Sequence, residues 1–187
     1  MAIFVFLILL TTSGWGQIEQ KSPKGVAAAR ELIRERRYKD AITKLEEALE
    51  TAPNNAEALS LLGAAYLYGE QDFIKAKKTF EASSGAGGGA TFWVNHSHEK
   101  LGTSELSDYC RGWFYIRKGG IEFSPEHSDH GFRLSYGEVK ELKQNRLFKS
   151  QFHINDGQKT FNFRPRTGDE GEVWLVVAMF KNLSNQK

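Results

Sequence analysis

Cysteine is almost absent from this chain of 187 residues, which contains only Cys110. A single cysteine excludes an internal disulfide framework and a zinc site rich in cysteine. Because unpaired cysteines usually behave as small apolar side chains, we expect Cys110 to be a buried hydrophobic residue rather than a site of intermolecular pairing.

An excess of charge of one sign is also lacking. The 25 basic and 23 acidic residues give a formal net charge of +2, so composition excludes a strongly basic nucleic-acid binder. Motifs for a nucleophile elbow, a phosphate-binding loop, a zinc-protease helix or a catalytic His and Cys pair are missing too. We therefore expect a protein that is not an enzyme and that uses no cofactor.

Long apolar runs are confined to the first residues. Residues 2–10 read AIFVFLILL, and small or polar residues follow, with Gly14 and Gly16 on either side of Trp15. This run has the length of a signal-peptide core, roughly 7–15 residues, and is shorter than the roughly 20 of a membrane-spanning helix. The sequence predicts a signal peptide at residues 1–16, a mature chain that begins at Gln17 and is not an integral membrane protein, and a periplasmic or secreted location.

Two segments of helical character are similar to each other at an offset of 35 residues. A period near 34 residues is typical of helix-turn-helix repeats. In each copy an aromatic residue ends the turn, a small alanine allows two helices to approach, and a bulky residue four positions later packs on the same face. The matched pairs are Tyr38 with Phe73, Ala41 with Ala76, and Leu45 with Phe80.

Residues 23–84 resemble tetratricopeptide repeats. The resemblance rests on Leu62, Gly63, Tyr66, Ala76 and Phe80 in the second copy and on Ala41, Leu45, Ala48 and Pro53 in the first. The segment PNNAEA is similar to the turn between repeats, where Pro53 ends one helix and Asn55 caps the next.

The resemblance implies a concave face that binds extended or helical peptides of a protein partner. In this chain we expect that face to carry Arg30, Ile33, Arg34, Glu57, Ser60, Ala64, Leu67 and Tyr68. Two repeats are fewer than a free-standing array normally needs, so the same face is alternatively a packing surface for the next domain.

After a glycine-rich linker predicted at residues 85–89, the pattern changes from helical to alternating. Seven short strands are predicted, at residues 90–98, 109–117, 121–124, 130–136, 139–143, 148–154 and 159–164. Residues 168–182 carry Val173, Trp174, Val177 and Phe180 at helical spacing, with Thr167 or Asp169 as the cap. The adjacent β-branched Val176 and Val177 keep an eighth strand as an alternative for this segment.

Residues 90–183 resemble the pleckstrin-homology-like barrel, including its GRAM-type branch, in the order of strands, turns and final helix. The resemblance implies a helix that closes one end of the barrel, where Trp174 would be part of the core. The fold class expected is therefore α+β, with two tetratricopeptide-like hairpins before a seven-stranded antiparallel barrel and a C-terminal helix. The loop at residues 98–108 has one Lys against three acidic residues, so phosphoinositide binding is not expected.

Four histidines are candidates for a metal site. His96 and His98 share one face of a predicted strand, and His127 and His130 flank the loop before another. Neutral imidazole binds zinc, copper or nickel, but nothing in the sequence brings the two pairs together, and each histidine is alternatively solvated or hydrogen bonded to backbone.

The function predicted from the sequence is a non-catalytic interaction or scaffold protein of the cell envelope or extracellular space, of bacterial type. It would bind a protein or peptide partner through the repeat groove, the β-module or both. The alternative is a metal- or ligand-sensing module that uses His96, His98 and His130.

Overall fold

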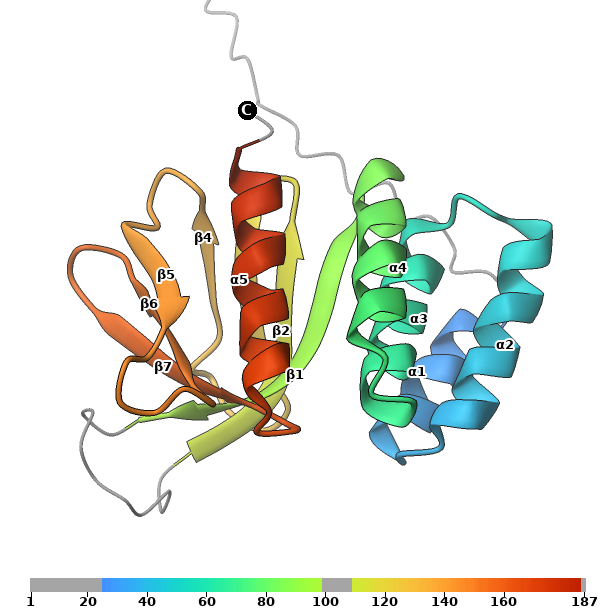
Figure 1. Ribbon diagram of the computed structural model, residues 1–187, viewed down its shortest axis with the longest axis horizontal. Helices are drawn as coiled ribbons and strands as arrows, with labels where there is room; N and C mark the ends of the chain where they lie inside the picture. The colour runs from blue at the N-terminus through green and yellow to red at the C-terminus, as the bar shows by residue number, and fades with distance from the viewer. Residues whose placement is uncertain (1–24, 99–108, 186–187) are drawn as a thin grey trace, which may run out of the picture.

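The computed structural model describes residues 25–98 and 109–185 of the chain. A helical part, an antiparallel sheet and a C-terminal helix lie side by side, with the C-terminal helix in front of the sheet in the view of Figure 1. Within the described residues no helix combines the length and apolar character that are needed to cross a bilayer. The predicted signal peptide at residues 1–16 lies outside these residues.

Two helical hairpins form the first part of the fold. The helices are α1 (Val26–Arg34), α2 (Tyr38–Thr51), α3 (Ala56–Gly69) and α4 (Phe73–Gly85). The Asn55 side chain accepts a hydrogen bond from the Ala58 backbone N–H, and Asp72 does the same for Lys75, so these two residues cap α3 and α4. The left-handed residues Arg36 and Gln71 lie in the turns of the two hairpins, again 35 positions apart.

The predicted contact between helices is present in both hairpins. Ala41 and Ala76 are fully buried, as are the bulky residues Leu45 and Phe80. Gly63 on α3 lies directly against Phe80, since a Cβ atom at this position would approach ring carbons of Phe80 to 2.6 Å. Small residues at these positions therefore allow the close approach of neighbouring helices.

Seven antiparallel strands follow, as predicted. They are β1 (Gly89–Ser97), β2 (Tyr109–Arg117), β3 (Gly120–Pro125), β4 (Phe132–Ser135), β5 (Glu141–Gln144), β6 (Phe152–Asn155) and β7 (Thr160–Pro165). Their order in the sheet is β4-β3-β2-β1-β7-β6-β5. The final helix α5 (Glu170–Ser184) begins at Asp169, whose side chain accepts from the Gly171 backbone N–H, so an eighth strand is excluded.

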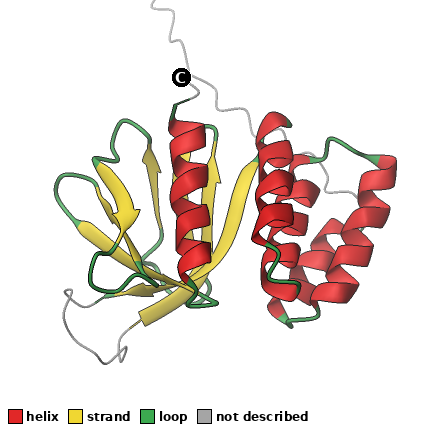
Figure 2. Ribbon diagram, viewed as in Figure 1, coloured by secondary structure: helices red, strands yellow, loops and turns green. Residues whose placement is uncertain are grey.

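The prediction of a closed barrel is wrong, because β4 and β5 are the two edges of the sheet and no ladder of the described strands joins them. Each of these edge strands has only four residues. The helix α5 contacts β5, β1 and β2, and its Phe180 ring packs against Tyr136, just after β4, at 5.6 Å between centroids. A helix, rather than further strand pairing, thus covers the apolar side of the sheet (Figure 2).

The prediction that Trp174 belongs to the core is also wrong. Its side chain is 55% exposed. The buried face of α5 is formed by Val173, Val176, Met179 and Leu183, which recur at helical spacing. Trp174 lies one position off that face and borders a shallow surface depression together with Phe73 and Ile74 of α4.

The connection between the helices and the sheet is short. The helix α4 continues to Gly85 and β1 begins at Gly89, so residues 86–88 alone join them. The Ser83 hydroxyl donates to the Ala56 carbonyl and accepts from the Gly89 backbone N–H. These bonds attach the start of β1 to both α3 and α4, and the two parts of the chain pack directly on each other.

Candidate binding cleft and histidine cluster

Much of the predicted repeat groove is occupied by the chain itself. The helix α3 packs on β1, and the hydroxyls of Ser60 and Thr91 are hydrogen bonded at 2.5 Å across this contact. Of the eight predicted groove residues, five are buried: Ile33, Ser60, Ala64, Leu67 and Tyr68. Apart from Ser60, which also borders the open part of the groove, these side chains are not accessible to a partner.

A buried hydrogen-bond network joins three elements at this contact. The Tyr68 hydroxyl of α3 accepts from the Trp93 backbone N–H of β1 at 2.6 Å and donates to Glu172 Oε1 of α5 at 2.7 Å. The other carboxylate oxygen of Glu172 accepts from the backbone N–H and the hydroxyl of Thr167. Burial raises the pKa of Glu172 to about 7, although the bonds from Thr167 and Tyr68 oppose this effect.

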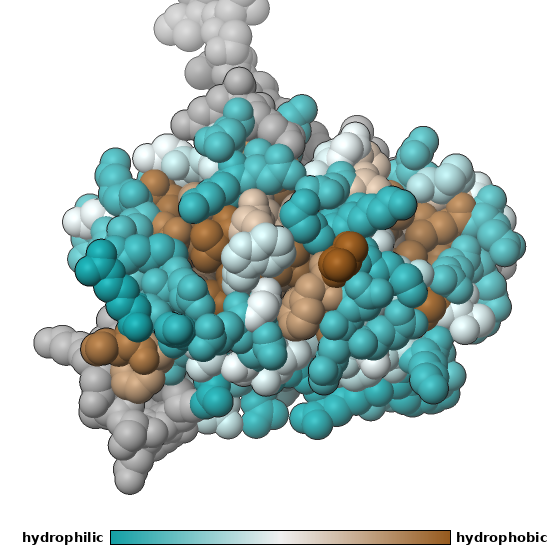
Figure 3. Space-filling view, in the orientation of Figure 1, coloured by the Kyte–Doolittle hydropathy of each residue, from teal (hydrophilic) through white to brown (hydrophobic). Residues whose placement is uncertain are grey.

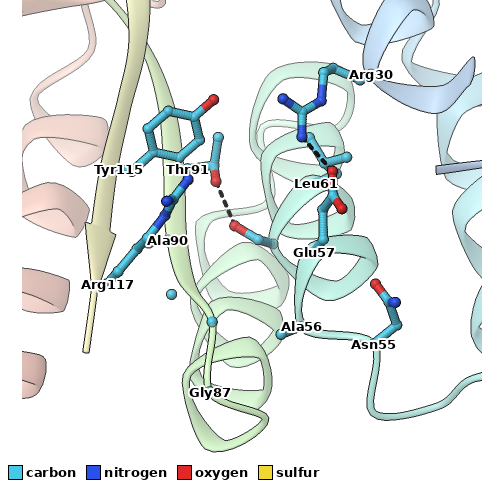
Figure 4. Close-up of a pocket in the computed structure, with 13 residues that line it drawn as sticks. Arg30, Asn55, Ala56, Glu57, Leu61, Gly87, Ala90, Thr91, Tyr115 and Arg117 are labelled. Carbon is cyan, nitrogen blue, oxygen red and sulfur yellow. Dashed lines mark hydrogen bonds and ion pairs between the residues drawn. The ribbon is translucent and has the colours of Figure 1, made fainter. Parts of the chain in front are cut away.

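The part of the groove that stays open is a cleft of about 520 Å³ between the repeats and the sheet. Figure 4 shows Arg30 and Glu57 on the helical side and Tyr115 and Arg117 of β2 on the opposite side. The volume lies within the range of roughly 300–1,000 Å³ that is usual for ligand sites. The remaining lining comes from Asn55, Ala56, Ser60, Leu61, Gly87, Gly88, Gly89, Ala90 and Thr91.

The charged side chains of the cleft form ion pairs but remain partly exposed. Arg30 and Glu57 form an ion pair and stay about one-third exposed. Arg117 lies over the Tyr115 ring, with its guanidinium carbon 4.3 Å from the ring centroid, and reaches Glu122 at 3.3 Å. Two guanidinium groups and one carboxylate therefore line the cleft, which favours a ligand with negative charge.

The third open residue of the predicted groove, Arg34, lies outside the cleft. Its guanidinium is 3.3 Å from Glu31 of the same helix and 3.9 Å from Glu126, just after β3. Arg34 thus bridges the first helix and the β-module. Tyr115 and Arg117 are cleft residues that sequence reasoning missed, because they reach the cleft only through the pairing of β2 with β1, which packs on α3.

A second site is formed where the predicted histidines meet. His96 lies on β1 and His98 directly follows this strand, and the β1–β2 register places His96 directly opposite Cys110. Cys110 Sγ is 3.2 Å from His98 Nε2 and 3.7 Å from His96 Nδ1. His130, before β4, brings its Nδ1 to 3.2 Å from His98 Nε2. His127 is exposed and is not among the ligand atoms that converge in the described part of the chain.

Cys110 packs against the apolar core, as expected of a small apolar side chain, but it is only half-buried and also contacts the two histidines. The cluster is closed on one side by aromatic rings, since His96 packs between Phe123 and Phe163 at 5.3 and 4.9 Å between centroids. Burial, together with the neighbouring His98 and His130, lowers the pKa of His96 to about 4, so its imidazole is neutral at physiological pH.

Comparisons with known proteins agree with the helical part of this description. The family model for the tetratricopeptide repeat matches residues 30–67, from α1 into α3. A repeat of this family suggests a role in protein–protein interaction. No curated protein matches the chain. The repeat precedes seven antiparallel strands and a final helix, which are the elements that the sequence pattern predicted.

Two solved structures are similar to this chain at low identity. The N-terminal PH domain of human ARAP2 is 13% identical with a TM-score of 0.37, over 52% of this chain and 83% of that domain. The C-terminal domain of an unknown protein from Leishmania infantum is 14% identical with a TM-score of 0.36, over 49% and 81%. At these scores neither structure carries an inference about function.

Proposed function

We propose that this chain is a non-catalytic interaction protein that binds an extended, acidic segment of a protein partner in the cleft between α3 and β2. The observation that carries the proposal is the combination of a tetratricopeptide repeat with an open cleft on which Arg30, Glu57, Tyr115 and Arg117 converge. Most of the remaining groove is buried against the sheet, so a peptide can reach the repeat's inner face through the cleft.

The chemistry of the cleft supports an acidic peptide. Arg117 can donate two parallel hydrogen bonds to a carboxylate from one wall, and Arg30 can do so from the other after partial release from Glu57. The Tyr115 ring offers an apolar surface beside these charges. A peptide that spans the cleft therefore gains charge-assisted hydrogen bonds together with aromatic packing.

The location proposed for this function is the cell envelope or the extracellular space, where the chain would serve as a scaffold. The apolar run at residues 2–10 and the small residues after it support export. N-terminal sequencing of secreted material is expected to begin at or near Gln17, and a chain that keeps Met1 would contradict export without affecting the cleft.

A peptide selection tests the cleft directly. The purified chain is used to select from a random peptide library, and the enriched peptides are measured by fluorescence polarisation. We expect acidic sequences whose affinity falls at least about tenfold, or 1.4 kcal/mol, in the Arg30→Ala and Arg117→Ala double variant. The matched control is Arg146→Ala, an exposed arginine on the β5–β6 connection. Selected peptides that bind the double variant and the control equally would refute the cleft as the binding site.

A further inference from the structure

The ligand atoms of His96, His98 and Cys110 converge at separations that suit a metal site, and His130 approaches this group from the side of His98. In a tetrahedron with metal–nitrogen bonds of about 2.0 Å and a metal–sulfur bond of about 2.3 Å, neighbouring ligand atoms lie roughly 3.3–3.5 Å apart. The observed separations from sulfur to nitrogen are 3.2 and 3.7 Å, and the two nitrogens of His98 and His130 are 3.2 Å apart. The ligand atoms of His96, His98 and Cys110 all lie within 4.8 Å of one another.

We infer that this cluster binds a transition-metal ion such as Zn²⁺, with His96 Nδ1, His98 Nε2 and Cys110 Sγ as ligands and His130 Nδ1 as the fourth. Imidazole nitrogen and thiolate sulfur suit zinc, copper or cobalt, whereas magnesium and calcium require oxygen ligands. The nitrogen and sulfur donors of the cluster therefore favour a transition-metal ion over magnesium or calcium.

The elements that carry the ligands position them before any metal binds. His96 and Cys110 pair directly at one end of the nine-residue β1–β2 ladder, and His98 follows the last paired residue of β1. The His96 ring is held between Phe123 and Phe163. The second ring nitrogen of His130 lies 3.6 Å from Asp129 Oδ1, and a carboxylate beside the outer nitrogen is a common way to orient a metal-binding histidine.

The site is independent of the proposed peptide cleft. The cleft lies at the opposite end of the same ladder, where Gly89 pairs with Arg117. The peptide cleft and the metal site can therefore be tested separately, because loss of Arg30 and Arg117 should leave metal binding intact.

The test uses Zn²⁺ and Co²⁺ with the purified full chain. We expect one equivalent of Zn²⁺ by calorimetry and a thiolate-to-cobalt charge-transfer band on addition of Co²⁺. Because Cys110 is the sole cysteine, a thiol-alkylating reagent reports its state directly, and Zn²⁺ should slow this alkylation. Cys110→Ser and His98→Ala should each lower zinc affinity by at least about tenfold and abolish the cobalt band.

His127→Ala is the matched control, since it removes an exposed histidine from the same loop as His130. It should bind zinc like the unmodified chain. His98 is exposed, and Cys110 is half-buried at the edge of the apolar core, where serine has nearly the same shape. The metal-free unfolding midpoints of both variants should therefore stay close to that of the unmodified chain; if His98→Ala lowers the midpoint, His130→Ala replaces it. Absence of zinc binding in the unmodified chain, or unchanged binding in both ligand variants, would overturn the inference.

Discussion

At the scale of single residues, Glu172 is a carboxylate buried at the point where α3, β1 and α5 meet. Its neighbours are the Tyr68 hydroxyl, the Thr167 backbone and hydroxyl, and the more distant charge of Asp169. The pKa of about 7 in the folded chain exceeds the value of 4.5 expected when Glu172 is unfolded. The folded state therefore retains this proton over a range in which the unfolded state releases it.

This difference predicts a pH dependence of stability. The contribution of Glu172 is fully present below about pH 4.5 and is lost as the pH rises through about 7, and it amounts to no more than about 3 kcal/mol. Glu172→Gln is neutral at every pH and should remove this dependence, so the free energy of unfolding of the unmodified chain should fall relative to the variant between pH 5 and pH 8. Denaturant unfolding across that range measures it.

The comparison with Glu172→Gln is necessary because His96 also makes stability depend on pH, in the opposite direction to Glu172. The lowered pKa of His96 means that its contribution is lost as the pH falls from about 6.5 through about 4, but this effect is common to both proteins and cancels in their difference. Glu170→Gln, an exposed carboxylate in the same helical turn, is the control. Parallel stability curves for Glu172→Gln and the unmodified chain would contradict the prediction.

At the scale of elements, the C-terminal helix was predicted at the right place in the sequence, but Trp174 was wrongly assigned to its buried face. The helix α5 lies against both the sheet and α4, so its buried residues extend over more of its circumference than a single stripe. Trp174 lies between these contacts, near Ile74 of α4, whose side chain is 84% exposed. In Figure 3 this face is mainly hydrophilic, with apolar groups along α5 and beside α4.

The orientation of α5 predicts unequal effects for two substitutions. Trp174→Ala should cost much less than the about 3–5 kcal/mol typical of a fully buried aromatic residue, because over half of its side-chain surface is already exposed. Met179→Ala on the buried face should cost about 2–5 kcal/mol through the cavity that it leaves. Chemical denaturation of both variants measures the difference, and a greater loss for Trp174→Ala would show that the helix packs in another orientation.

At the scale of the whole molecule, the repeats and the sheet share one apolar core. Residues from α1 to α4, from β1 to β3 and from α5 belong to the same buried cluster. The Phe80 ring of α4 packs against Phe92 of β1 at 5.3 Å between centroids. Two repeats thus gain from the sheet the apolar contact that additional repeats would otherwise supply.

This shared core predicts that the two parts unfold together. Far-UV circular dichroism follows the helices. Tryptophan fluorescence follows the sheet through Trp93 and Trp113, whose rings are buried and 4.7 Å apart on β1 and β2, and it also includes the signal of Trp174 on α5. We expect the two signals to change in one coincident transition. Tyr68→Phe removes the hydroxyl between Trp93 and Glu172 and should lower both midpoints together, at a cost of about 1–3 kcal/mol. A separate helical transition would show that the repeats fold independently.

Local elements were determined by the sequence alone. The 35-residue offset placed both hairpins, since Ala41 and Ala76 must be small where helices touch. Asn55 marked the start of one helix and Thr167 or Asp169 the start of another; in the structure Asn55 and Asp169 satisfy backbone N–H groups that the helix leaves unpaired. Alternation predicted the strands, with β2 at its observed bounds, because successive side chains point to opposite faces.

Only the tertiary structure decided which of these residues meet. Whether Leu67 and Tyr68 line an open groove or a buried contact depends on β1, which packs across α3 and lies after the second hairpin in the chain. The approach of His96, His98 and Cys110 depends on the β1–β2 register, and that of His130 on the turn before β4. Such contacts join segments whose separation in sequence carries no periodic signal, so the partners of each side chain follow from packing and not from local pattern.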